Sequence, residues 1–246
     1  MEMGSSIKEV GMVVDVDSVV GHRAAVQVAP VETRLRMIGV CELQVCGLSA
    51  AAVRVVAVVI RPDQSESLRW QQHGERVLYE SPWVTVTKVD VTPPDGNRFE
   101  HHAVRLQRVA MAVVVDDADR VLMVWRHRFI TNSWGWELPG GIVDDGEDAV
   151  VTAERETVEE TGWRPEGLSL LAQFQPMPGL VDTPHEVYGT RHAVEVGEPS
   201  DPVEVGVVEW VPLAETLGMI RAGDVAGAGS IVGLLRVLAD PKGLPA

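Results

Sequence analysis

The chain has 246 residues, a formal net charge of -15 at pH 7 and an isoelectric point near 4.8. This negative charge argues against electrostatic binding of nucleic acid or of a membrane surface, so a small anionic ligand would have to be held by local cations and metal ions. The longest nearly apolar run, residues 50–60, contains Arg54 and is too short to span a bilayer, and residues 1–20 hold no signal-peptide core, so we expect a cytoplasmic protein.

The first 68 residues differ in composition from the rest. Every Trp, Tyr and Phe lies at or beyond Trp70, whereas the segment before it is rich in valine and holds both cysteines, Cys41 and Cys46. A Cys-x4-Cys pair without partner ligands is a poor zinc site and predicts two reduced thiols. Residues 1–68 are therefore expected to be an extension of unclear structure. An accessory β-rich subdomain, a poorly ordered segment and a mis-assigned start are the three alternatives for it.

A hairpin signature follows in residues 69–106. Two segments of alternating character, 83–91 and 98–106, flank the sequence Pro-Pro-Asp-Gly-Asn at 93–97. Alternation on both sides of such a turn predicts an antiparallel β-hairpin. We expect the core of the main domain to occupy residues 107–246.

Two strands are expected next, at 108–115 and 120–125, and the second runs into Arg126-His127-Arg128. Residues 134–141 read Trp-Gly-Trp-Glu-Leu-Pro-Gly-Gly, a strand end that enters a tight glycine turn. Glycines at such a turn let the backbone approach a ligand closely. Trp136 is compatible with either core packing or contact with a substrate.

Residues 147–161 predict a helix with an unusual charge pattern. The segment lacks Pro and Gly, carries apolar residues at helical spacing, and is followed by the stop signal Gly162. Within it, Glu156, Glu159 and Glu160 are related by i, i+3 and i+4 spacing, so their side chains share one face.

Three like charges on one helix face repel, and each raises the pKa of the others. A divalent cation reverses this effect, and Mg2+ and Mn2+ prefer carboxylate oxygens as ligands. Arg155, beside the cluster in sequence, can pin a carboxylate in place. A solvated acidic face is the alternative, but it requires neither Arg155 nor a fixed spacing to the upstream glycine turn.

The pattern resembles the Nudix box of the Nudix hydrolases, and the Glu-Leu-Pro-Gly-Gly run before it is also similar to that family. The fixed positions of the box are all present, at Gly141, Glu147, Arg155, Glu156, Glu159, Glu160 and Gly162. Thr157 and Trp163 depart from the usual aliphatic residues, which concerns packing rather than chemistry. The resemblance implies an α/β fold over residues 69–246, an α/β/α sandwich with a mixed sheet. It also implies an enzyme that hydrolyses a nucleoside diphosphate linked to a further group X.

The resemblance also implies roles for individual residues. The implied ligands of Mg2+ or Mn2+ are the backbone carbonyl of Gly140 and the side chains of Glu156, Glu159 and Glu160. Arg155 would orient the glutamates, and Glu147 would contribute to the local field. A pyrophosphate is polyanionic, so metals would neutralise it and activate a water.

Two further elements resemble the ADP-ribose pyrophosphatase branch of the family. Pro176-Met177-Pro178-Gly179 is similar to its Pro-x-Pro-Gly element, although Met177 departs from the usual small residue and a plain proline-rich turn is the alternative. In that branch an Arg near this position faces the substrate phosphates, and Arg128 is the residue that matches it. The alternative is that Arg128 is simply an exposed basic residue at the end of a strand. The predicted substrate-binding residues are Arg128, Trp136, Pro178 and Gly179.

The family often places its general base on a late acidic loop. Residues 198–204 form such a loop between strands expected at about 187–196 and 205–212, and its candidate acids are Glu198, Asp201 and Glu204. Two helices are expected after it, at 213–220 and 231–238. In the ADP-ribose branch a leading antiparallel segment like residues 76–106 helps to form a homodimer, so the resemblance implies one here.

These observations predict metal-dependent hydrolysis of a small-molecule nucleotide, with ADP-ribose giving AMP and ribose 5-phosphate as the first candidate. A nucleoside triphosphate or another nucleotide sugar is the alternative substrate. A non-catalytic, nucleotide-sensing Nudix domain is a third interpretation. Such domains in transcription regulators carry a damaged box and a helix-turn-helix module, whereas this chain has an intact box and no basic recognition helix.

Overall fold

The computed structural model describes residues 68–200, 206–241 and 243–244. Every described residue belongs to one unit of the chain, Ser67–Ala246. The interpretations of Cys41, of Cys46 and of the N-terminal extension therefore lie outside the described residues.

This unit begins with a three-stranded antiparallel sheet. Its strands are β1 (Gln71–Glu80), β2 (Thr85–Thr92) and β3 (Phe99–Arg105). Val91 of β2 lies opposite Phe99 of β3 across the turn at 93–97, so the predicted hairpin is confirmed. Gly96 in that turn has a φ of 82°, in the left-handed region that glycine adopts without steric cost. A short strand from a later loop, β10 (Val181–Asp182), joins the sheet parallel to β3.

Two sheets form the core of the unit, with strand orders β7-β4-β11-β9 and β13-β5-β6, and β8 pairs with β12 beside them. The strands are β4 (Val109–Val114), β5 (Arg120–Arg128), β6 (Ser133–Glu137), β7 (Gly140–Ile142), β8 (Trp163–Glu166), β9 (Ser169–Phe174), β11 (His185–Thr190), β12 (His192–Glu195) and β13 (Val207–Pro212). β11 runs parallel to β4 and antiparallel to β9, so the sheet is mixed, as predicted. β4 is buried along almost its whole length, as expected for an apolar strand covered on both faces.

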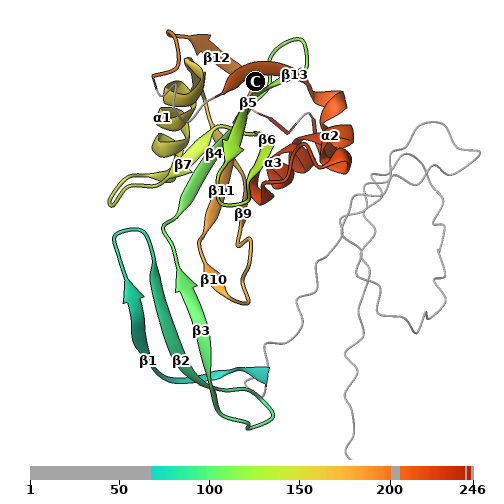
Figure 1. Cartoon of the computed structure of the whole chain (residues 1–246). Coiled ribbons are helices and arrows are strands. Elements are labelled where there is room, and N and C mark those ends of the chain that lie inside the picture. Colours follow the sequence, from blue (N-terminus) through green and yellow to red (C-terminus); the bar gives the residue numbers. More distant parts are fainter. Residues whose placement is uncertain (1–67, 201–205, 242, 245–246) are drawn as a thin grey trace, which may run out of the picture. The chain divides into compact units, whose positions relative to one another are not determined.

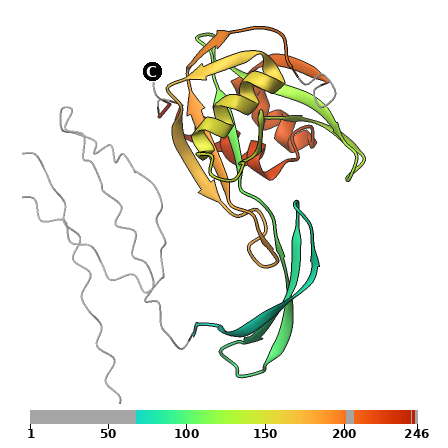
Figure 2. The same cartoon turned by 90° about the vertical axis from the view of Figure 1, so that its left-hand side faces the viewer.

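Helices cover both faces of these strands. Figure 1 places α1 (Ala149–Thr161) on one side and α2 (Thr216–Ala222) with α3 (Ala228–Ala239) on the other, and Figure 2 shows α1 in front and the other two behind. Side chains of β4 on opposite faces pack against the two helix layers. Ala110 packs with α1, whereas Met111 and Val113 belong to the larger hydrophobic cluster under α3. The predicted α/β/α sandwich is confirmed.

The carboxylate helix begins at Ala149 rather than at the predicted Glu147. Asp148 is the N-cap in an extended conformation, and Glu147 belongs to the preceding turn, in which its N–H donates to the Asp144 carbonyl at 3.0 Å. The helix ends as predicted, because Gly162 caps it with a φ of 75°. The two C-terminal helices predicted at 213–220 and 231–238 correspond to α2, which a 3-10 turn at Leu213–Glu215 precedes, and to α3.

Candidate active site

α1 holds its three neighbouring glutamates at different depths. The exposed fraction of the side chain is 4% for Glu160, 18% for Glu156 and 44% for Glu159. Their side chains share one face of the helix, but they lie at different angles around its axis, so their distance from the core differs. Of the predicted metal ligands on α1, Glu160 is thus buried, Glu156 is partly buried and Glu159 is the most exposed.

The glycine pair of β7 packs directly against Glu160 and Glu156. The N–H of Gly140 donates to Oε2 of Glu160 at 3.0 Å. A Cβ on Gly141 would lie 2.3 Å from the carboxyl carbon of Glu156, and a Cβ on Gly140 would lie 2.5 Å from the carbonyl oxygen of Ala110. The structure therefore brings Gly140, Glu156 and Glu160 together, and it does so because neither glycine has a side chain.

Arg155 links the remaining carboxylates of the box. Its Nη1 donates to Glu156 at 2.8 Å and to Glu159 at 3.1 Å, while its Nη2 donates to Glu147 at 3.1 Å. The Thr152 hydroxyl also donates to Glu147, at 2.6 Å. One guanidinium held against three carboxylates is the geometry expected of a residue that orients the glutamates.

Burial and ion pairing act in opposite directions on these groups. Burial raises the pKa of both Glu156 and Glu160, although hydrogen bonds from Arg155 and Arg126 oppose the shift. A hydrogen bond from Arg155 lowers the pKa of Glu147. Two neighbouring carboxylates that pay a desolvation cost as anions are stabilised by a cation placed between them.

β5 is longer than predicted and carries two arginines to the same site. Alternate residues of a strand share a face, so Arg126 and Arg128 project to the side on which Glu160 lies. Nη1 of Arg126 is 2.7 Å from Oε1 of Glu160. Arg128 is half exposed and donates two hydrogen bonds, at 3.0 and 2.6 Å, to Glu137. Arg126 was not among the predicted site residues, although the Arg-x-Arg spacing in a strand was a signal for it.

The tryptophans of β6 lie on the other face of this strand pair. Trp136 is opposite Trp125, with ring centroids 5.4 Å apart, and it packs against the core cluster under α3. Its neighbour Glu137 points the opposite way, toward Arg128. The predicted contact between Trp136 and substrate remains a prediction, and core packing is the role that its surroundings show.

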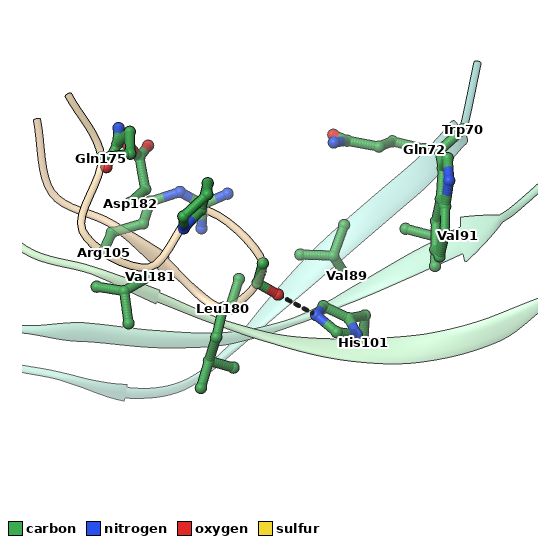
Figure 3. Close-up of a pocket in the computed structure, with 13 residues that line it drawn as sticks. Trp70, Gln72, Val89, Val91, His101, Arg105, Gln175, Leu180, Val181 and Asp182 are labelled. Carbon is green, nitrogen blue, oxygen red and sulfur yellow. Dashed lines mark hydrogen bonds between the residues drawn. The ribbon is translucent and has the colours of Figure 1, made fainter. Parts of the chain in front are cut away.

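The predicted residues Pro178 and Gly179 line a pocket of about 630 Å3 that is formed by β1, β2, β3 and the loop before β10. Nε2 of His101 lies 3.0 Å from the carbonyl oxygen of Gly179, and this hydrogen bond is the dashed line at His101 in Figure 3. Figure 3 shows Trp70 and Gln175 on opposite sides of the pocket, with His101 between them. The described residues that line it include none of the box carboxylates, so the predicted substrate residues fall into two separate groups.

The loop that carries the candidate general bases is anchored to the end of α1. The N–H of Val196 donates to the carbonyl of Gly162 at 2.8 Å, and the N–H of Ser200 donates to that of Glu159 at 2.9 Å. Glu198 lies between these two attachment points in the chain. Asp201 and Glu204 lie outside the described residues.

The convergent groups fit a hard divalent cation. Within the described ranges no three His, Cys, Asp or Glu side chains are placed as a ready metal cluster. The donor set is nevertheless all oxygen, and the Gly141 position leaves the carboxylate of Glu156 room that a Cβ would fill. The residues that would hold such an ion are Gly140, through its carbonyl, Glu156, Glu160 and Glu159.

Comparison with known proteins decides the family. The model of the NUDIX domain matches residues 105–228, a stretch that contains both β5 and the carboxylate helix. The chain belongs to the Nudix family. The Nudix fold is also found in a solved structure, the crystal structure of an ADP compounds hydrolase. That structure is 22% identical in sequence and has a TM-score of 0.62, and the match covers 73% of this chain and 98% of that one.

Two relatives refine the position of this Nudix protein. A CMP-5'-(N-acetyl-N-hydroxy-3-aminopropyl)phosphonate hydrolase of Streptomyces rubellomurinus is 47% identical over 171 residues, which cover 70% of this chain and 83% of the relative. An ADP-ribose pyrophosphatase of Mycobacterium tuberculosis is 30% identical over 156 residues, which cover 62% of this chain and 75% of the relative. The predictions of a Nudix hydrolase near the ADP-ribose pyrophosphatase branch, and of an enzyme, are confirmed.

Nudix hydrolases generally use divalent metal ions and act on small nucleotides, which agrees with the oxygen donors described above. None of the helices in the described part of the chain has the length and apolar character needed to cross a bilayer.

Proposed function

We propose that this Nudix enzyme uses Mg2+ or Mn2+ to hydrolyse the P–O–P anhydride between a nucleoside monophosphate and a second phosphorus group that carries X. The observation that carries the proposal is the close packing of the Gly140–Gly141 pair against two carboxylates of α1, those of the buried Glu160 and the partly buried Glu156. Buried, mutually repelling carboxylates are costly to a fold unless a cation joins them.

When bound, the divalent ion supplies charge neutralisation of the diphosphate and a water of lowered pKa. The residues of the chain would do the rest. Glu156 and Glu160 would hold the ion, with Glu159 at the solvent side, and Arg155 would keep them aligned together with Glu147. Arg128 is half exposed beside this group and would meet a phosphate oxygen. The 198–204 loop would supply the general base, for which Glu198 has the anchored position.

Two substrates are supported by separate observations. The 47% identical relative acts, by its name, on CMP joined to a phosphonate, in which the anhydride links a phosphate to a phosphonate phosphorus. ADP-ribose is supported by the Pro176–Gly179 element and by the 30% identical relative. We place the CMP-linked phosphonate first, because the sequence similarity to that relative is higher and extends over more of both chains.

A direct competition tests this order. Purified protein with Mg2+ is incubated with a CMP-linked alkylphosphonate and with ADP-ribose, and the products are followed by 31P NMR and chromatography. We expect CMP and free phosphonate at a kcat/KM at least tenfold above that for release of AMP and ribose 5-phosphate. A preference for ADP-ribose would reverse the order, and hydrolysis of neither in the presence of Mg2+ or Mn2+ would overturn the proposed activity.

We also propose that the enzyme is a homodimer that pairs through β1. This strand lies at the edge of its sheet, and all ten of its residues are exposed. Val77, Leu78 and Tyr79 on it have exposed fractions of 55%, 44% and 58%. A long, exposed edge strand with apolar side chains is a surface that pairs with another chain.

A further inference from the structure

Arg126 is a buried cation at the centre of the site. Only 3% of its side chain is exposed, and its partner Glu160 is 4% exposed. A buried ion pair adds little to stability, because the desolvation of two charges offsets their attraction. Two apolar residues of similar size would serve the core of a protein at least as well.

The guanidinium is also incompletely hydrogen-bonded. Nε and Nη2 are buried and have no hydrogen-bond partner among the described residues. Nε lies 3.8 Å from Oε2 of Glu137, beyond hydrogen-bond distance. A buried donor without a partner is destabilising, so the presence of Arg126 is better explained by what it does to Glu160 than by the stability of the fold.

The two oxygens of Glu160 are each fixed by one donor. Oε1 receives Nη1 of Arg126 at 2.7 Å and Oε2 receives the N–H of Gly140 at 3.0 Å. These bonds on two sides fix the plane of the carboxylate. Each carboxylate oxygen can accept a second interaction, so both remain able to coordinate a cation.

Arg128, two residues along the same strand, is placed differently. Its side chain is 51% exposed and its Nε and Nη2 both donate to Glu137. An exposed guanidinium can reach a substrate, whereas one that is 3% exposed cannot do so without rearrangement of the site. The two arginines of the Arg-x-Arg pair therefore divide into one buried and one accessible group.

We propose that Arg126 is a positioning residue for the metal site: it holds the carboxylate of Glu160 in the orientation that binds a divalent cation and does not itself bind substrate. The proposal rests on the proposed metal-dependent function. It predicts that the role of Arg126 is measurable as cation affinity in the absence of any nucleotide.

The test is a titration of the substrate-free protein with Mn2+, with free Mn2+ measured by electron paramagnetic resonance. Arg126→Gln is expected to weaken Mn2+ affinity by about tenfold to a hundredfold, as found for residues that orient metal ligands. Arg126→Lys retains the positive charge but not the planar guanidinium with its several N–H donors. Its Mn2+ affinity is expected to lie between those of Arg126→Gln and the wild type. Arg128→Gln is the matched control for Arg126→Gln. We expect its Mn2+ affinity to stay within about threefold of the wild-type value and its KM for the nucleotide to rise.

Each outcome is decisive. Unchanged Mn2+ affinity in both Arg126 variants, with native circular dichroism, overturns the positioning role while leaving the metal-dependent function intact. A raised KM at unchanged Mn2+ affinity also overturns it, because that result makes Arg126 a phosphate ligand. Absence of Mn2+ binding by the wild type overturns both proposals. If Arg126→Gln does not fold, Arg126→Lys alone carries the test, and wild-type affinity in it contradicts the proposal.

Discussion

Glu156 of α1 lies against Gly141 of β7 so closely that a Cβ on the glycine would stand 2.3 Å from the carboxyl carbon. The glycine that opens the Nudix box is thus required by the position of a glutamate fifteen residues later, not by its own backbone angles. This contact ties β7, the strand of Gly140 and Gly141, to the helix that carries the box carboxylates.

Gly141→Ala is expected to displace the Glu156 side chain and leave the fold intact, because a side chain is the group that must move. Mn2+ affinity should fall by about tenfold or more, as for other changes that misplace a ligand. Gly140→Ala is the contrasting variant. Its new Cβ would meet the backbone of β4, 2.5 Å from the Ala110 carbonyl oxygen, so thermal stability should fall as well. Equal melting temperatures for the two variants would contradict this distinction.

Glu160→Gln is expected to lower kcat by about a hundredfold or more, since it removes the charge of a buried ligand while keeping its shape. Glu154→Gln is the control on the same helix. Glu154 is exposed and contacts only Arg164, at 3.8 Å, among the ion pairs of the described residues, so its loss should leave kcat unchanged. Full metal-dependent activity in Glu160→Gln would remove the box glutamates from the mechanism.

The metal-free protein is expected to gain stability from Glu156→Gln. Burial raises the pKa of Glu156 in the folded state, so the folded protein binds more protons than the unfolded chain, and this carboxyl lowers stability as pH rises above its ordinary pKa. Scanning calorimetry in EDTA should show a higher Tm for the variant at pH 7, with a difference that shrinks toward pH 4. Added Mn2+ should reverse the order, because only the wild type gains full binding energy. A lower Tm for the variant in EDTA at every pH would contradict the assignment.

The homodimer prediction is tested by charge on the edge strand. Val77→Lys together with Tyr79→Lys is expected to shift the mass measured by light scattering from dimer to monomer, because charged side chains disfavour edge pairing. Val194→Lys is the control. It adds the same charge at a residue of β12 that is also half exposed, and the mass should not change. A wild-type protein that is monomeric at all concentrations would contradict the dimer directly.

The sequence predicted well whatever depends on local periodicity. The hairpin around Gly96, the helix that ends at Gly162 and the shared face of Glu156 and Glu160 follow from turn chemistry and from the 3.6-residue repeat. The start of α1 lies two residues later than predicted, because the Asp148 backbone is extended and the N–H of Glu147 bonds to the Asp144 carbonyl in a turn.

The depth of each charged group depended on the tertiary structure. The resemblance singled out Arg128, but nothing in the sequence predicts that Arg126 is buried and Arg128 exposed, since both are arginines near the end of one strand. The difference arises in the folded protein, where Arg126 is buried against Glu160 of α1 and Arg128 is half exposed beside Glu137. Likewise, successive side chains of β6 point to opposite faces of the strand, so Trp136 packs against the core and Glu137 pairs with the arginines. The sequence alone determined which charges the protein has and which of them share a helix face. Only the packing of α1 on the sheet decided which of those charges are buried together, because burial depends on contacts between segments far apart in the chain.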